Sequence, residues 1–421
     1  AGIDEAVALA EKSDVIIAVV GECSGRTSGE SRSRSNLYLP GRQRDLLRAL
    51  HATGKPVVMV LITGRPPTIN WSVNNLPAIL CAWYPGAHGG TAIAEALFGE
   101  INPGGKSPGT FIKTVGQIPW NFPCKPGTQP PKGRIMSRID GVLYPFGHGL
   151  SYTSFQYSNL RIDNEFISPD GTLTVSCDIT NTGDRPGDEV PQLYIRDVYS
   201  SITMYEKMLR GFERIHLNAG ETKTVHFRID APRQLWLCNE AMQRVVEPGE
   251  FKVMVGSSSE DIRLDGRFYV VTSQREIDAI IQKQNRADHL EGLVQAGGHS
   301  GDHKPVHVID GNLSSRWACN QPDKSWLELG LGTDRPVSEL SVKWYQGSRG
   351  SRYTFEIQVV SPTGDWETVY KGTSSGGSAA FETYRFPKIV TNAIRIVGHG
   401  GSKGKTTAID EIRIPGWTPG Q

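Results

Sequence analysis

The sequence predicts a multidomain protein in which a partial α/β sandwich is followed by two β-sandwiches. Helical patterns alternate with β-branched runs in the first region, period-two alternation fills the second, and another all-β texture fills the third. A chain of 421 residues also exceeds one ordinary hydrophobic core, which favours several domains. We place the three domains and the two connecting segments between them at residues 1–125, 126–154 (connecting), 155–272, 273–294 (connecting) and 295–421.

The first region has the pattern of a doubly wound α/β layer. The runs DVIIAVVG and KPVVMVLITG are continuous and β-branched, which is typical of parallel strands covered on both faces. Between them, RQRDLLRALHATG carries leucines on one helical face, places Asp45 on the exposed face and stops at Gly54. Because only three parallel-strand signals are visible and the chain opens on a helix, we expect a flavodoxin-like sandwich that starts partway through a domain.

Composition excludes several classes of partner. Lys and Arg number 45 against 44 Asp and Glu, so a net charge of +1 provides no field to attract nucleic acid or an anionic membrane. No run approaches the roughly 20 apolar residues of a membrane-spanning helix. The six cysteines form no CxxC pair, which argues against a zinc knuckle or a dithiol redox site and favours buried free thiols.

The two remaining regions have the pattern of antiparallel β-sandwiches. LTVSCDIT, VPQLYIRD, KTVHFRID and FKVMVGS alternate with period two between Gly-, Pro- and Asn-rich turns, and their aromatic residues are expected in the core. SQREIDAIIQKQNRAD is a polar, partly helical connector. Seven further strand-like runs after about residue 295 predict a jelly roll, with Trp317, Trp326 and Trp344 in its core.

Ordered motifs over about residues 1–272 resemble the C-terminal half of family 3 glycoside hydrolases. These motifs are SGE, LPGRQRDLLRAL, AWYPGAHGGTAIAEALFGEINPGGKSPGTF and LYPFGHGLSYTSF, in that order. The stretches ITNTGDRPGDEVPQLYIRD, KMLRGFERIHLNAGETKTVHF and VEPGEFKVMVGSS are similar to the immunoglobulin-like, fibronectin type III-like domain that follows in that family. The family comprises β-glucosidases and β-xylosidases built on a TIM barrel plus an α/β sandwich.

The family resemblance implies a catalytic role for one glutamate. Retaining glycosidases use two carboxylates about 5–5.5 Å apart, and in this family the nucleophile is a barrel Asp while the acid/base Glu reaches in from the sandwich. SGESRSR places Glu30 at that position, and Arg32 and Arg34 beside it would lower its pKa or clasp sugar hydroxyls. The alternative is a solvated Glu30 paired with either arginine. Glu22, at the strand end, is expected to support the loop through backbone amides.

The resemblance also implies that the catalytic nucleophile is not among these residues. No stretch resembles the barrel, so we expect the nucleophile on a missing N-terminal TIM barrel of the same polypeptide. The implied function is hydrolysis of O-glycosidic bonds at the non-reducing end of β-glucosides or related oligosaccharides, without a catalytic cofactor. As an isolated fragment the chain is expected to be inactive. The alternative function is a non-catalytic carbohydrate-binding or scaffold protein.

The last 125 or so residues resemble a discoidin domain, the fold shared by family 32 carbohydrate-binding modules and other galactose-binding-like jelly rolls. VIDGNLSSRW, VSELSVKWYQG, YTFEIQVVS, AIRIVGHG and AIDEIRI carry this resemblance. Such modules hold a structural Ca²⁺ between backbone carbonyls, an early Asp and a late Glu. Asp310 and Glu411 match those positions and Asn312 is a further candidate, whereas the bare residues also fit a turn and an exposed strand side chain.

Sugar contacts in discoidin-type modules come from loops at one end of the sandwich. Here Tyr345, Arg349, Arg352 and His399 are the candidates, and the positive charge of the loops that carry them favours an acidic polysaccharide. The alternative is a merely solvated basic edge. An oligo- or polysaccharide partner in turn implies a periplasmic or extracellular location.

Overall fold

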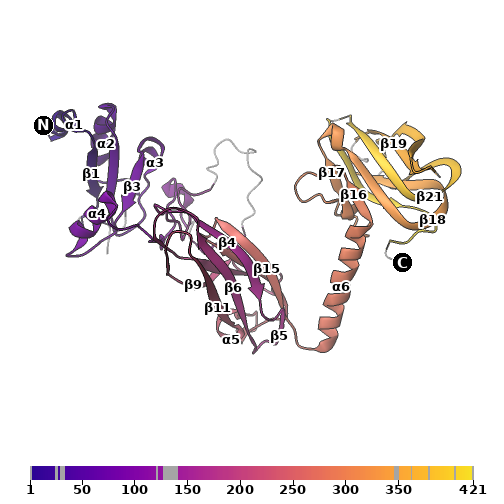
Figure 1. Cartoon of the computed structure of the whole chain (residues 1–421), viewed down its shortest axis with the longest axis horizontal. Coiled ribbons are helices and arrows are strands. Elements are labelled where there is room, and N and C mark those ends of the chain that lie inside the picture. Colours follow the sequence, from indigo (N-terminus) through magenta and orange to yellow (C-terminus); the bar gives the residue numbers. More distant parts are fainter. Residues whose placement is uncertain are drawn as a thin grey trace. The chain divides into compact units, whose positions relative to one another are not determined.

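A computed structural model of the protein describes residues 2–23, 27–28, 34–119, 122–126, 141–345, 350–361, 363–377, 380–402 and 404–419. The chain divides into two compact units, Ala1–Ser273 and Gln274–Gln421, which are described separately. Figure 1 colours the first from indigo to salmon and the second from salmon to yellow. Among the described residues, no helix is long and apolar enough to cross a membrane.

The first unit opens with a three-stranded parallel sheet in the order β1-β2-β3. Its elements are α1 (Gly2–Ala10), β1 (Ile16–Gly21), α2 (Gln43–Ala52), β2 (Val57–Ile62), α3 (Asn70–Asn75), β3 (Ala78–Cys81), α4 (Gly89–Phe98) and the short 3₁₀ helix η1 (Val115–Gln117). Leu47 and Leu50 of α2 are buried against one face of the sheet, as their helical spacing predicts. Asp45 is exposed on the opposite side of that helix, as expected.

Strand β1 is covered on one face, whereas its β-branched run predicts cover on both. Ile16, Ala18 and Val20 point into the core. Ile17 and Val19 point the other way and are 46% and 59% exposed. In the described part of the chain, no element covers this second face of β1 closely enough to bury its side chains, and β1 is also an edge strand of the sheet.

The rest of the first unit is a sandwich of a three-stranded sheet, β11-β6-β4, and a five-stranded sheet, β5-β15-β14-β8-β9. Its strand pairs are antiparallel except for β5, which pairs with β15 in parallel. Its elements are β4 (Phe155–Ile162), β5 (Phe166–Ile167), β6 (Thr172–Asn181), β7 (Gly187–Glu189), β8 (Gln192–Asp197), β9 (Met208–Phe212), β10 (Ile215–Leu217), β11 (Thr222–Asp230), α5 (Ala231–Gln234), β12 (Leu237–Cys238), β13 (Arg244–Val245), β14 (Gly249–Gly256) and β15 (Ile262–Val270). Alternate residues of β6 are buried, which confirms the period-two reading of its sequence.

The segment at residues 143–155 (LYPFGHGLSYTSF) ties the α/β layer to the sandwich. Gln192, at the start of β8, donates from Nε2 to the carbonyls of Gly147 and Ser257 at 3.1 and 2.8 Å. Gly147 has φ of +81°, and a Cβ there would lie 2.0 Å from the Gln192 side-chain oxygen. Lys106 adds a largely buried ion pair with Glu189 at 2.8 Å.

The second unit begins with the long helix α6 (Gln274–Gly292), which the sequence predicts as a partly helical connector. A jelly-roll sheet follows in the order β17-β22-β18-β21-β19-β20, with β16 paired to β18. Its elements are β16 (Val294–Ala296), η2 (Pro305–Val308), β17 (Trp317–Cys319), η3 (Pro322–Lys324), β18 (Trp326–Trp344), β19 (Tyr353–Val360), β20 (Trp366–Thr373), β21 (Glu382–Gly401) and β22 (Thr407–Arg413). Four of the predicted runs join pairwise into the long strands β18 and β21, whose pairing shifts register at two points.

One tryptophan prediction is wrong. Trp317 and Trp344 lie in the core, 0% and 3% exposed, but Trp326 is only partly buried and carries the Arg395 guanidinium 4.6 Å from its ring. Leu327 faces the core, so its neighbour Trp326 must face outward. The register shifts within β18 then reverse which positions face inward before Trp344 is reached.

The cysteine prediction is confirmed in part. All six cysteines are free. Cys177 and Cys319 are buried, but Cys23 and Cys238 are exposed and the other two are intermediate.

Candidate functional site

A buried carboxylate lies where β1 and β2 end. Glu22 follows β1 directly, and its backbone N–H donates to the Ile62 carbonyl at 2.8 Å. Its side chain is fully buried. Arg65, just after β2, donates from Nε and Nη2 to the two Glu22 oxygens at 3.0 and 2.5 Å, and the Thr63 hydroxyl donates at 3.2 Å. The carboxyl end of a parallel sheet is where α/β folds present functional loops.

Arg34 closes this cluster from the other end of the loop. Its Nη1 donates to a Glu22 carboxylate oxygen at 2.7 Å and to the Thr27 carbonyl at 2.5 Å, and its Nη2 donates to the Tyr38 carbonyl at 3.2 Å. Glu22 therefore holds two guanidinium groups in the described structure instead of the backbone amides that the sequence suggests. The loop that follows Glu22 is fixed where it leaves the sheet and where it reaches Arg34.

The predicted catalytic loop itself is described only in part. Glu30 and Arg32 lie outside the described residues, so their roles stay predictions. Arg34 is described, and the bonds above satisfy its guanidinium within the protein. A direct contact between Arg34 and sugar also stays a prediction.

The second unit has a pocket of about 360 Å³ at one end of its sandwich. Its lining is Ser300, His303, Arg316, Ala318, Asn320, Tyr345, Ser351, Tyr353, Gly401, Gly404, Thr406 and Ala408. The Arg316 guanidinium stacks 3.8 Å from the centre of the Tyr345 ring. Tyr353 donates its hydroxyl to the Tyr345 carbonyl at 2.9 Å, which fixes the second aromatic ring. Burial, and then the charge of Arg316, lower the pKa of His303, so its imidazole favours the neutral form.

The pocket includes one of the predicted sugar-binding residues. Tyr345 lines it, whereas Arg349 lies outside the described residues. Arg352 is exposed and does not line the pocket, and its backbone N–H donates to the Ser402 hydroxyl. His399 is also exposed outside the lining, 3.3 Å from Glu356.

Sequence reasoning missed the residues that give the pocket most of its polarity. His303, Arg316 and Asn320 come from segments well before the loop of Tyr345. Arg316 and Asn320 directly flank β17, so the buried sequence WAC between two polar residues was the available signal. Only the pairing of β17 with β22 shows that this strand reaches the same end of the sandwich.

The predicted metal ligands Asp310 and Glu411 lie close together. Glu411 is 6% exposed, and its Oε2 has no hydrogen-bond partner among the described residues. Burial, and then repulsion from Asp310, raise the pKa of Glu411 to about 7. Asp310 accepts hydrogen bonds from the Asn312 N–H and the Ser315 hydroxyl at 2.8 and 2.7 Å. Asn312 uses its own side-chain oxygen on the Ser314 N–H.

These acidic residues alone do not make a closed metal site. Among the described residues, no group of three or more His, Cys, Asp or Glu is arranged to hold a metal. A cation near Asp310 and Glu411 would therefore need further oxygen ligands, such as backbone carbonyls or the Asn312 side chain. The unpartnered Glu411 oxygen fits such an ion, because buried polar atoms ordinarily have a partner.

Three family models match successive parts of the chain. Residues 1–152 match the glycosyl hydrolase family 3 C-terminal domain. Residues 189–259 match a fibronectin type III-like domain, and residues 307–396 match a NedA-like, galactose-binding domain.

Similar proteins are glycoside hydrolases. A "Beta-xylosidase" of Formosa agariphila is 46% identical over 260 residues, covering 62% of this chain and 36% of that protein. A "Periplasmic beta-glucosidase" of Salmonella typhimurium is 44% identical over 271 residues, covering 62% and 35%. The solved β-glucosidase of Listeria innocua in complex with glucose matches with a TM-score of 0.60 and 33% identity, covering 64% of this chain and 38% of that one.

The chain thus spans 36% and 35% of the length of these two curated relatives. The matched segments follow the α/β layer, the first sandwich and the jelly roll in chain order. The chain therefore carries the C-terminal domain of glycosyl hydrolase family 3, joined to a fibronectin type III-like domain and a NedA-like, galactose-binding domain.

Proposed function

We propose that the polypeptide containing this chain is a retaining β-glycosidase that removes glucose or xylose from the non-reducing ends of β-linked oligosaccharides. The observation that carries the proposal is the 46% identity over 260 residues with a β-xylosidase, joined by 44% identity with a β-glucosidase. The nucleophilic Asp then belongs to a TIM barrel of the same polypeptide, outside these 421 residues. Alone, the chain holds half of a catalytic pair and is expected to be inactive.

Glu30 is the proposed acid/base residue. It protonates the leaving glycosidic oxygen while the barrel carboxylate attacks the anomeric carbon, and it then takes a proton from the water that hydrolyses the glycosyl-enzyme. The Glu22 cluster supports this role, because it fixes Arg34 and thereby the end of the loop that carries Glu30. In this proposal Arg32 contacts the substrate and Arg34 positions the loop.

The test uses the polypeptide extended upstream through the barrel, assayed with p-nitrophenyl β-glucoside, p-nitrophenyl β-xyloside and an alkyl β-glucoside. Glu30→Ala should slow the alkyl glucoside by a factor of about 10²–10⁴, and the p-nitrophenyl substrates much less. Azide should partly restore the variant, because a small anion can attack the glycosyl-enzyme without a base. Glu100→Ala, at an exposed glutamate of the same domain, is the matched control and should retain full activity.

The outcomes separate the parts of this proposal. An active wild type with an unaffected Glu30→Ala variant would show that the loop is structural. An inactive wild type on every glycoside would favour the second candidate function, a non-catalytic carbohydrate-binding or scaffold protein. The pocket of the second unit is the observation that favours this alternative.

We also propose that the pocket of the second unit binds a pyranose. A ring stacked under a guanidinium, a neutral imidazole and an amide are groups that sugar hydroxyls and C–H faces can use. Arg349, Arg352 and His399 would act at its margin. Calorimetric titration with methyl β-galactoside should detect binding that Arg316→Ala abolishes. Arg385→Ala, at an exposed arginine paired with Glu339, is the control and should bind as the wild type does.

A structural Ca²⁺ is proposed at Asp310 and Glu411, with backbone carbonyls and Asn312 as candidate further ligands. Hard carboxylate and carbonyl oxygens are the donors that this ion prefers. The fit rests on the buried, unpartnered Glu411 oxygen beside Asp310. Calorimetric titration of the chelator-treated chain with Ca²⁺ should give one site that Glu411→Gln removes. No heat with the wild type would overturn the assignment.

The proposed location is the periplasm or the exterior of the cell. One relative carries the name periplasmic β-glucosidase, and a polysaccharide-binding domain is of use where polysaccharide is present. Fractionation of cells producing the whole polypeptide, followed by immunoblotting, tests this location.

A further inference from the structure

The fibronectin type III-like domain has a pocket of about 450 Å³ that the proposed function does not use. Its lining is Pro232, Arg233, Trp236, Arg244, Val245 and Val246, and we call it the Trp236 pocket. Sequence analysis places the aromatic residues of this domain in the core. That expectation is wrong for Tyr199, Phe212 and Trp236, which are 80%, 67% and 39% exposed.

The local sequence favours the exposure of Trp236. Leu235 and Leu237, on either side of Trp236, are 4% and 2% exposed and belong to or adjoin the core. Leu235 ends α5 in the helical region (φ −110°, ψ 0°) and Leu237 begins β12, so the chain passes from helix to strand at Trp236 while both leucines face inward. Gln234 secures the start of the segment, because its Nε2 donates to the Arg210 carbonyl at 2.7 Å. The indole is therefore presented at the surface by an anchored backbone.

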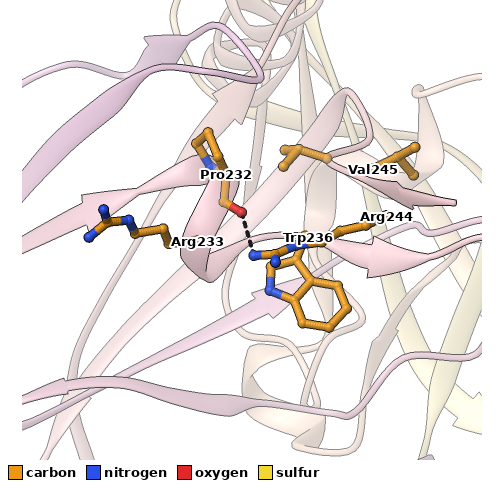
Figure 2. Close-up of a pocket in the computed structure, with 6 residues that line it drawn as sticks. Pro232, Arg233, Trp236, Arg244 and Val245 are labelled. Atoms are coloured by element: carbon orange, nitrogen blue, oxygen red, sulfur yellow. Dashed lines mark hydrogen bonds between the residues drawn. The ribbon is translucent and has the colours of Figure 1, made fainter.

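Arg244 is held over the indole from the facing strand. The β12–β13 pairing sets Arg244 opposite Cys238. Its guanidinium lies 4.3 Å from the centre of the Trp236 ring, and its Nη2 donates to the Pro232 carbonyl at 2.9 Å. Figure 2 shows the guanidinium between that carbonyl and the ring. Only one of its five N–H donors is thus assigned to a partner among the described residues.

The charged side chains that line the pocket have one sign. Its six lining residues include two arginines and no carboxylate. Arg233 is 84% exposed and lies 3.9 Å from Asp230, a separation that leaves its charge largely available to solvent. A ligand with an apolar face and one negative charge complements this combination of indole and guanidinium groups.

We propose that the Trp236 pocket binds a uronic acid residue of a polysaccharide, with the sugar ring against the part of the indole that Arg244 leaves exposed and the carboxylate on Arg244. Stacking supplies the contact that any pyranose can make, and the paired oxygens of a carboxylate match the fork of a guanidinium. The inference rests on the proposed function only in taking a sugar as the ligand. It adds an acidic sugar to the substrate class, at a site separate from the catalytic loop.

The test is a titration of the 421-residue chain labelled with ¹⁵N-tryptophan. The chain has nine tryptophans, so the spectrum contains several indole signals. The signal that is missing from the spectrum of the Trp236→Phe variant is that of Trp236. Methyl β-D-glucuronide is expected to shift that signal with a saturable, millimolar affinity. Methyl β-D-glucoside and inorganic phosphate should bind at least about fivefold more weakly, because each lacks one of the two contacts.

Two variants test the named contact. Arg244→Gln should weaken glucuronide binding at least about fivefold, while its circular dichroism spectrum remains that of the wild type. Arg267→Gln removes the same charge from β15 of the same domain, outside the pocket lining, and should leave the affinity unchanged.

Three results would overturn the proposal. They are an unmoved Trp236 signal, an equal affinity for glucoside and glucuronide, and an affinity for phosphate that equals that for glucuronide. Hydrolysis of neutral p-nitrophenyl glycosides does not involve the Trp236 pocket. The glucuronide titration therefore tests the Trp236 pocket alone, and the glycoside assay tests the proposed catalytic function alone.

Discussion

Glu22 is the residue whose surroundings most constrain the α/β layer. Its carboxylate is inaccessible to solvent and bonded to Arg34, Thr63 and Arg65. The two arginines reach it from segments 12 and 43 residues away. The buried carboxylate of Glu22 is thus the counter-charge for two guanidinium groups, those of Arg34 and Arg65.

Neutralising Glu22 should be costly. Glu22→Gln leaves two guanidinium groups without a counter-charge, and breaking a buried ion pair costs about 3–5 kcal/mol. We expect the thermal transition of the first unit to fall markedly in differential scanning calorimetry. Asp45→Asn, at an exposed helix residue 3.6 Å from Arg42, should change stability by less than about 0.5 kcal/mol. Equal effects of the two substitutions would contradict the buried-pair interpretation.

Asp197 should make stability depend on pH. Burial, and then repulsion from Glu247, raise the pKa of Asp197 to about 6 in the folded protein. Below about pH 4 the group is protonated in both states, and between about 4 and 6 only the unfolded chain loses the proton. The contribution of this residue to stability therefore falls as pH rises through that window and is then constant.

Asp197→Asn removes that contribution. Relative to the wild type, the variant should gain about 1 kcal/mol between pH 4 and pH 7, after allowance for solvent screening. Melting temperatures of both proteins across this range measure the difference. Parallel curves would show that Asp197 titrates normally in the folded protein.

At the scale of elements, the segment at residues 143–155 joins the α/β layer to the first sandwich through a glycine. Gly147→Ala should destabilise the first unit by about 2 kcal/mol or more, because its Cβ would meet the Gln192 side chain at 2.0 Å. Gly220→Ala is the matched control, since Gly220 has a similar φ of +75° but open space around it. The control should cost only about 1 kcal/mol. Calorimetry measures the stability lost in each variant. Equal losses would mean that the Gln192 side chain moves away from the new Cβ at little cost.

Much of this architecture is predictable from local sequence, because strand and helix periodicity depend on near neighbours. The alternation in β6 and the leucine face of α2 are of this kind. The outward position of Trp326 also follows from local alternation with Leu327, whereas register shifts further along β18 decide that Trp344 faces the core. Candidate sites follow the same division. Tyr345 lies in a recognisable loop, whereas Arg316 joins it only through long-range strand pairing. Arg65 meets Glu22 only because β1 and β2 are paired in register.

At the scale of the whole molecule, the two units have separate hydrophobic cores. The jelly-roll core is built from residues after 289, and those of the first unit end at residue 270. We expect two calorimetric transitions, of which Glu22→Gln lowers only the one assigned to the first unit. Calcium at 100 times its Kd should stabilise only the second unit, by about 2.7 kcal/mol, and so raise only the temperature of the other transition. A single transition that both changes shift would contradict independent folding.

The outer face of β1 has a practical consequence for handling these 421 residues as a purified protein. Val15, Ile17 and Val19 are 53%, 46% and 59% exposed, and they lie in or beside a strand at the edge of its sheet. An exposed apolar face on a strand with a free edge can associate with the same surface of another molecule. Purified at high concentration, the chain will tend to associate and scatter light. Its colloidal stability should therefore depend on concentration well below the temperature at which either unit unfolds.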